Sequence, residues 1–203
     1  MGRNGVGKTT LIRSITALTP PAKGRITFDG AELTKLAPHR IARLGVALVP
    51  QGRRVFGSLT VAEHLEKMPG RPRHDEEWTV ARVLEVFPRL RERWRQKAAH
   101  LSGGEQSMLA IARALRLNPK CLLMDEPMEG LSPVYVQAVA EVIQRLRREG
   151  SLSILLVIPE LALALKLADR ICVMSTGEIV FTGTPEELQA RSDVQARYIG
   201  VGH

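Results

Sequence analysis

The sequence predicts an α/β fold in which a parallel sheet is covered by helices on both faces. Short apolar runs alternate with amphipathic helical stretches along most of the chain, which is typical of parallel strands buried on both sides. Strand patterns are missing between about residues 52 and 118, so we expect an inserted helical subdomain there. The core lobe would then comprise residues 1–51 and 119–203 of a single domain.

The amino-acid composition favours a globular protein and argues against a nucleic-acid-binding or membrane-spanning one. The chain of 203 residues is 44% hydrophobic and 25% charged, which is typical of a globular protein. Its formal charge of +8 could suit an anionic partner, but aromatic residues make up only 4%, so a base-stacking surface for nucleic acid is not expected. No apolar run is long enough for a membrane helix. Cys121 and Cys172 lie in apolar runs, so we expect buried thiols and no disulfide.

The first residues match a phosphate-binding loop. Residues 2–9 read GRNGVGKT, which fits G-x-x-x-x-G-K-[ST]. The glycines allow consecutive N–H groups to surround an anion. Lys8 offers a charge to the phosphates, and the Thr9 hydroxyl offers a ligand to Mg²⁺. We expect residues 10–15 to form a helix whose N-terminus faces the phosphate.

The remaining elements follow from apolar periodicity and from capping residues. The first helix is expected to end near Leu18, before Pro20 and Pro21, and the Asp29-Gly30 pair predicts a hairpin turn. Strands are expected over residues 45–49, 121–124, 152–158, 170–174 and 179–182. Helices are expected over residues 38–44, 133–149 and 160–168, and after capping boxes that begin at Thr60, Ser102 and Thr184.

Two acids follow a buried strand. Asp125 and Glu126 come directly after the apolar residues 121–124. Carboxylates at the tip of a buried strand are costly unless a cation or hydrogen bonds compensate, and Mg²⁺ beside a phosphate loop would do so. The alternative is a pair of exposed turn acids. Residues 101–106 read LSGGEQ, and by themselves they can be interpreted simply as the start of a capped helix.

Together these motifs resemble the ATP-binding subunit of an ABC transporter, a P-loop NTPase, over essentially the whole chain. The corresponding segments are residues 2–9 for the Walker A loop, Gln51 for the Q-loop glutamine, residues 101–106 for the LSGGQ signature, and residues 121–125 for Walker B, followed by Glu126. VPQGRRVF at residues 49–56 and EGLSP at residues 129–133 resemble the subfamily that imports branched-chain amino acids or urea.

The resemblance implies that two copies stack head to tail with ATP and Mg²⁺ between them. Each ATP would lie between the phosphate loop of one copy and the signature of the other. The implied nucleotide ligands are Gly2, Asn4, Gly5, Gly7, Lys8, Thr9, Thr10, Ser102, Gly103 and Gly104. The implied metal ligands are Thr9, Gln51 and Asp125, and the implied catalytic residues are Glu126, which would handle the attacking water, and Gln51.

The resemblance also implies partners and a location. The partners would be a second ABC ATP-binding subunit in a homo- or heterodimer, transmembrane permease subunits and, indirectly, a solute-binding protein. The chain would act in the cytoplasm, peripherally on the inner face of the membrane.

Three features depart from the family pattern. The sequence begins at the phosphate loop, so we expect an N-terminally truncated cassette with unpaired strand edges and poor stability. Met128 stands where Ser or Thr is common, and Ser132 replaces an acid. Pro159 takes the place of the switch histidine and has no polar side chain and no N–H. These departures leave two alternatives: a catalytically degenerate or truncated cassette, and a soluble ABC-type ATPase that acts on nucleic acid or ribosomes.

Overall fold

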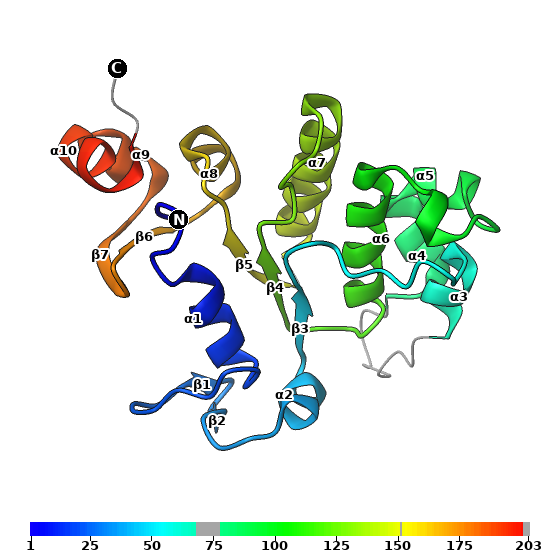
Figure 1. Cartoon of the computed structure of the whole chain (residues 1–203), viewed down its shortest axis with the longest axis horizontal. Coiled ribbons are helices and arrows are strands. Elements are labelled where there is room, and N and C mark those ends of the chain that lie inside the picture. Colours follow the sequence, from blue (N-terminus) through cyan, green and yellow to red (C-terminus); the bar gives the residue numbers. More distant parts are fainter. Residues whose placement is uncertain (68–77, 151, 201–203) are drawn as a thin grey trace. The chain divides into compact units, whose positions relative to one another are not determined.

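The protein is seen in a computed structural model that describes residues 1–67, 78–150 and 152–200 (Figure 1). The chain divides into two compact units. The first comprises Met1–Pro38 and Leu156–His203, and the second comprises His39–Leu155. The stretch expected to form a helical subdomain lies within the second unit, and its boundaries near residues 52 and 118 stay a prediction. Residues 68–77 of that stretch are outside the described residues.

A three-stranded sheet in the order β3-β4-β5 lies mainly in the second unit, and the last two residues of β5 belong to the first. β3 (Val46–Val49) and β4 (Cys121–Asp125) run parallel, with Val46 opposite Cys121. β5 (Ser153–Val157) is hydrogen-bonded beside β4. Most residues of β3 and β4 are buried, as the continuous apolar runs predict for strands covered on both faces.

The second unit also contains helices. They are α2 (Pro38–Leu44), α3 (Val61–Glu66), α4 (Val80–Val86), α5 (Pro88–Glu92), the 3₁₀ turn η1 (Ala98–His100), α6 (Gly103–Leu115) and α7 (Pro133–Glu149). α6 is almost wholly buried and packs against α3, α5, α7 and β3. α7 ends at Gly150, whose φ of 72° gives the left-handed C-cap that the sequence predicts.

The first unit combines helices with two antiparallel strand pairs, unlike the parallel β3–β4 pair. Its elements are α1 (Lys8–Ile15), β1 (Thr27–Phe28), β2 (Ala31–Glu32), α8 (Leu161–Leu167), β6 (Ile171–Ser175), β7 (Glu178–Gly183), α9 (Pro185–Gln189), α10 (Ser192–Val194) and the π-helical turn η2 (Gln195–Ile199). Asp29 and Gly30 form the predicted hairpin turn, with φ values of 50° and 76°.

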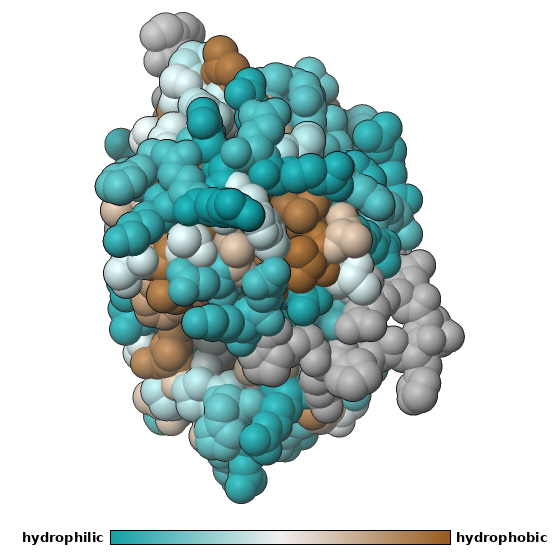
Figure 2. Space-filling view, turned by 90° about the vertical axis from the view of Figure 1, so that its right-hand side faces the viewer, coloured by the Kyte–Doolittle hydropathy of each residue, from teal (hydrophilic) through white to brown (hydrophobic). Residues whose placement is uncertain are grey.

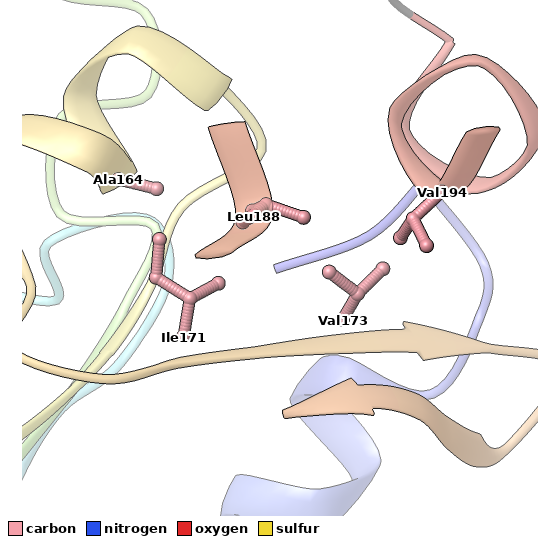
Figure 3. Packing of buried hydrophobic residues seen from close by; sticks show 5 residues of the cluster. All are labelled: Ala164, Ile171, Val173, Leu188 and Val194. Carbon is pink, nitrogen blue, oxygen red and sulfur yellow. The ribbon is translucent and has the colours of Figure 1, made fainter. Parts of the chain in front are cut away.

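Five buried hydrophobic side chains pack α8, α9 and α10 against β6 (Figure 3). Ile171 and Val173 stand on one face of the strand, two residues apart, as the period of a strand requires. Ala164 comes from α8, Leu188 from α9 and Val194 from α10. This cluster fixes the strand to which the phosphate loop is attached.

The surface is mainly polar. The face shown in Figure 2 is largely hydrophilic, with a small apolar patch near its middle. Among the described residues, no helix is long and apolar enough to span a bilayer. The expectation that both thiols are buried is wrong for Cys172, which is exposed because it points away from the face of Ile171 and Val173. Cys121 is half-buried, and burial raises the pKa of its thiol.

His64 is buried on α3, and backbone groups bind both of its ring nitrogens. Nε2 accepts the N–H of Phe56 at 3.0 Å, so Nδ1 carries the proton and donates to the Thr60 carbonyl at 2.8 Å. Burial lowers the pKa of His64 and the Arg113 guanidinium adds to this effect, against opposing contributions from the Thr60 carbonyl and Glu63. The ring is therefore held neutral.

This arrangement predicts a loss of stability on acidification. Above about pH 6.5 the imidazole is neutral in both the folded and unfolded chain. Below that pH the unfolded chain binds the proton more readily, so the free energy of unfolding falls as pH decreases. Thermal unfolding of the His64→Asn variant should show a shallower slope between about pH 7 and pH 5.5. The exposed His100→Asn variant is the control, and an unchanged slope in His64→Asn would contradict this assignment.

Candidate functional site

The phosphate loop, residues 2–9, has the backbone shape that the sequence predicts. Gly2, Gly5 and Gly7 have φ values of 143°, 81° and 104°, a region that other residues rarely adopt. Gly7 is the left-handed N-cap of α1, and no side chain caps the helix. The first N–H groups of α1 are thus available to an anion, which the helix dipole also favours.

Lys8 lies at the centre of this loop. Its side-chain ammonium donates hydrogen bonds to the carbonyl oxygens of Gly2 at 2.8 Å and Arg3 at 2.9 Å. Lys8 is 7% exposed, so its charge is held inside the loop by backbone dipoles. Thr9 is half-buried beside it, and Asn4 and Thr10 are exposed. The predicted ligands from residues 2–10 thus lie on one loop and the first turn of α1, and their binding of phosphate stays a prediction.

The loop is attached to β6 through Met1. The Met1 amino group donates to the Cys172 carbonyl at 2.7 Å, and the N–H of Met174 donates to the Met1 carbonyl at 2.8 Å. The expectation of an unpaired strand edge is therefore wrong for β6 at these two positions. Gly2 follows so closely that a Cβ atom there would overlap the Met174 carbonyl oxygen, which explains a glycine at this position.

Asp125 is the buried acid at the end of β4. It is 2% exposed, and its Oδ1 accepts no hydrogen bond from any residue that the structure describes. A buried carboxylate oxygen without a donor is unfavourable. A hard cation such as Mg²⁺ prefers oxygen ligands, so this oxygen fits the predicted metal site.

Glu126, the next residue, is linked to the Q-loop glutamine. The Gln51 side-chain amide donates to Glu129 at 2.8 Å and to Glu126 at 3.5 Å. Glu126 has a φ of 49°, which is rare for a residue with a side chain. Such backbone strain costs roughly 1–3 kcal/mol and tends to gather at functional sites. Gln51 and Glu126, the two proposed catalytic residues, thus lie close together, and Glu129 accepts the shorter bond from the same amide.

A cavity of about 400 Å³ opens beside these acids, within the second unit. Its lining comprises Val49, Pro50, Gly52, Arg53, Gln106, Ser107, Ala110, Glu126, Pro127, Glu129 and Gly130. The hydroxyl of Ser107 is buried and has no hydrogen-bond partner among the described residues. The cavity thus has both charged and unsatisfied polar groups in its wall, including the predicted catalytic acid.

The signature segment, residues 101–106, begins α6 with the predicted capping box. The Ser102 hydroxyl accepts the N–H of Glu105 at 3.2 Å, and the Glu105 carboxylate accepts the N–H of Ser102 at 2.8 Å. Burial alone would raise the pKa of Glu105, but the bonds from Ser102 and from Arg93 hold it below its usual value. Glu105 therefore stays charged and keeps the helix start rigid.

The two glycines of the signature segment face large side chains of the same unit. A Cβ atom on Gly104 would overlap the ring of Tyr135, from the first turn of α7. A Cβ atom on Gly103 would lie 2.8 Å from the end of the Arg53 side chain. The Ser102 hydroxyl also donates to the Tyr135 hydroxyl at 3.0 Å. No local pattern marks Tyr135, because its place depends on how α7 packs against α6.

The structure shows where the three residues that depart from the family pattern lie. Met128 is 7% exposed and lies in the interior. Ser132 is the N-cap of α7, although its side chain makes no capping bond. Pro159 is half-buried between β5 and α8 and has no polar hydrogen to donate.

Comparisons with known proteins place this geometry in a family. Residues 1–129 match the ABC transporter family. The chain belongs to it. The high-affinity branched-chain amino acid transport ATP-binding protein BraG of Pseudomonas aeruginosa is 45% identical over 202 residues, which cover 98% of this chain and 86% of BraG. The probable branched-chain amino acid transport ATP-binding protein LivF of Archaeoglobus fulgidus is 37% identical over 99% of this chain and 86% of its own length.

The solved structures agree with the fold. The ADP conformation of an ATP-binding cassette of an ABC transporter is 28% identical and gives a TM-score of 0.82, covering 100% of this chain and 86% of the other. The α/β class with a helix-covered sheet, predicted from the alternation of strands and helices, is thereby confirmed.

The packing of Tyr135 predicts that one substitution has unequal costs in two backgrounds. Gly104→Ala should lower the free energy of unfolding by about 1–3 kcal/mol, because the new methyl group overpacks against the ring. In a Tyr135→Ala background the same change should cost less, because the ring is gone and only the Cβ atom of residue 135, 2.7 Å from the new methyl group, still crowds it. Urea unfolding measures both values.

Gly103→Ala is the matched control, because its methyl group meets only the flexible end of Arg53. It should cost less than Gly104→Ala. Equal costs for Gly104→Ala in the two Tyr135 backgrounds would show that the ring does not impose this glycine.

Proposed function

We propose that this chain is the ATP-hydrolysing subunit of an ABC importer, for branched-chain amino acids or a similar small polar solute such as urea. The observation that carries the proposal is the 45% identity to BraG over 98% of the chain. The phosphate loop, the orphaned Asp125 oxygen and the strained Glu126 support ATP chemistry within that family.

The phosphate loop binds the nucleotide in this proposal. The ammonium of Lys8 leaves the carbonyls of Gly2 and Arg3 and binds phosphate oxygens. The N–H groups of Gly5 and Gly7 surround the phosphate, Thr10 follows in the first turn of α1, and the exposed Asn4 lies on the rim.

The acids prepare hydrolysis. Thr9, Gln51 and Asp125 are the proposed ligands of Mg²⁺, which would neutralise charge on the phosphates. Glu126 accepts a proton from the attacking water, and its strained backbone fixes the carboxylate. The Gln51 amide, bonded to Glu126 and Glu129, orients this group. Catalysis then consists mainly of positioning and charge stabilisation.

The second half of each site comes from a second copy or a related subunit. Ser102, Gly103 and Gly104 face the γ-phosphate held by the partner's phosphate loop. Closure of the two subunits moves transmembrane permease subunits, and a solute-binding protein delivers the solute to them. The chain then sits on the cytoplasmic face of the membrane through the permease, without nucleic acid.

Uptake by a reconstituted complex tests this function. The chain is combined with its permease subunits in vesicles, and uptake of labelled leucine, valine and urea is measured with ATP on the side of the chain. We expect ATP-dependent uptake of at least one solute, abolished by Lys8→Ala because the phosphate contact is lost. ATP turnover without uptake of any of these solutes would reject the proposed importer class.

Glu126→Gln separates binding from hydrolysis. The amide keeps the size of the side chain but cannot take a proton, so kcat should fall by about 100-fold or more. ATP affinity measured by calorimetry should stay within about threefold of the parent, since the phosphate loop is intact. Turnover within a few-fold of the parent would assign the base to another residue.

Pro159 leads us to expect a slow enzyme. If the switch position lacks a donor to the γ-phosphate, the missing interaction costs about 2.7–4 kcal/mol in the transition state, as for other oxyanion donors. Pro159→His should then raise kcat more than it changes KM. A folded Pro159→His variant with unchanged kcat would show that this position does not limit the rate.

A further inference from the structure

The Ser102 hydroxyl already makes two hydrogen bonds within its own subunit. A serine hydroxyl donates one bond and accepts two. Here it accepts the N–H of Glu105 at 3.2 Å and donates its single proton to the hydroxyl of Tyr135 at 3.0 Å. To bind a phosphate oxygen, Ser102 has to turn that proton away from Tyr135.

Tyr135 is held where this exchange can occur. Its ring lies so close to the backbone at Gly104 that any side chain there would overlap it. The ring stands in the first turn of α7, which begins at Pro133 with a preset φ. Tyr135 is half-buried there, and its hydroxyl lies 3.0 Å from the Ser102 hydroxyl oxygen, within bonding distance.

We propose that Tyr135 is a positioning residue for the signature serine: when a γ-phosphate from a second copy approaches, the Tyr135 hydroxyl rotates and donates to Ser102, which donates to the phosphate. This inference rests on the proposed function of the signature segment. In the rearranged chain, Ser102 accepts two bonds, from Glu105 and Tyr135, and donates one, so no hydroxyl is left unsatisfied.

The rearrangement needs only rotation of two hydroxyl hydrogens. No proton is transferred and no backbone moves. Hydrogen bonds in a chain polarise one another, so a serine that accepts from Tyr135 is a better donor to an anion. The Glu105 carboxylate, tied to Arg93 and to the N–H of Ser102, keeps the cap rigid during the exchange.

The test uses the full chain in the Glu126→Gln background, in which we expect closed dimers to accumulate because bound ATP is not hydrolysed. Dimer formation is followed by sedimentation as a function of ATP concentration. Tyr135→Phe keeps the ring on Gly104 and removes only the hydroxyl. It should raise the ATP concentration for half-maximal dimer formation by about five- to tenfold, the size of one net hydrogen bond.

Two controls distinguish positioning from packing. Tyr135→Phe added to Ser102→Ala should change the midpoint by less than about twofold, because the hydroxyl then has no serine to orient. Tyr198→Phe, which removes the hydroxyl of the other tyrosine, should have no effect. Thermal unfolding without ATP checks that Tyr135→Phe is folded.

The outcomes separate the two proposals. Dimers that form with ATP at the same midpoint in Tyr135→Phe would overturn the role of Tyr135 and leave the proposed function intact. An equal effect of Tyr135→Phe with and without Ser102 would show a purely structural role. If the parent Glu126→Gln chain forms no dimer at any ATP concentration, a site shared by two copies of this chain is rejected, and the role of Tyr135 between such copies is rejected with it.

Discussion

The burial of Asp125 is the constraint around which the second unit is organised. A carboxylate at 2% exposure with an oxygen that no described residue satisfies can persist only where the surrounding strands and helices fix it. β4 supplies that support, because Leu122, Leu123 and Met124 are buried just before it. Glu126 follows with a φ of 49°. The proposed metal ligand Asp125 and the proposed catalytic acid Glu126 are thereby placed at the end of a buried strand.

In the signature segment, too, residues that stabilise the fold are also the residues proposed to bind the nucleotide. Ser102 begins a helix, and the hydroxyl that caps α6 is also the group proposed to meet a phosphate. Gly104 is small because Tyr135 occupies its side, so the glycine is needed for packing within one subunit before any nucleotide is present. Structural and functional requirements therefore coincide at neighbouring residues, and a substitution that disturbs one also disturbs the other.

Local chemistry made much of the fold predictable. Three capping boxes, the Asp29-Gly30 turn and the glycine at the end of α7 depend on residues close in sequence, and all are present. The phosphate loop was predictable for the same reason. Contacts between distant segments were not: Gln51 with Glu129 and Ser102 with Tyr135 depend on how elements pack. The exposure of Cys172 depends on which face of β6 meets the helices, which an apolar run alone does not reveal.

The bonds of Lys8 to its own loop have a consequence for the energetics of the empty site. The two carbonyls of Gly2 and Arg3 act as an internal substitute for the ligand. The lysine side chain therefore loses its conformational entropy during folding, and nucleotide binding involves no second loss. The contribution of Lys8 to the free energy of nucleotide binding is then the difference between its bonds to phosphate oxygens and its bonds to the two carbonyl oxygens. A loop of this kind is a preorganised receptor whose empty form competes with its own ligand.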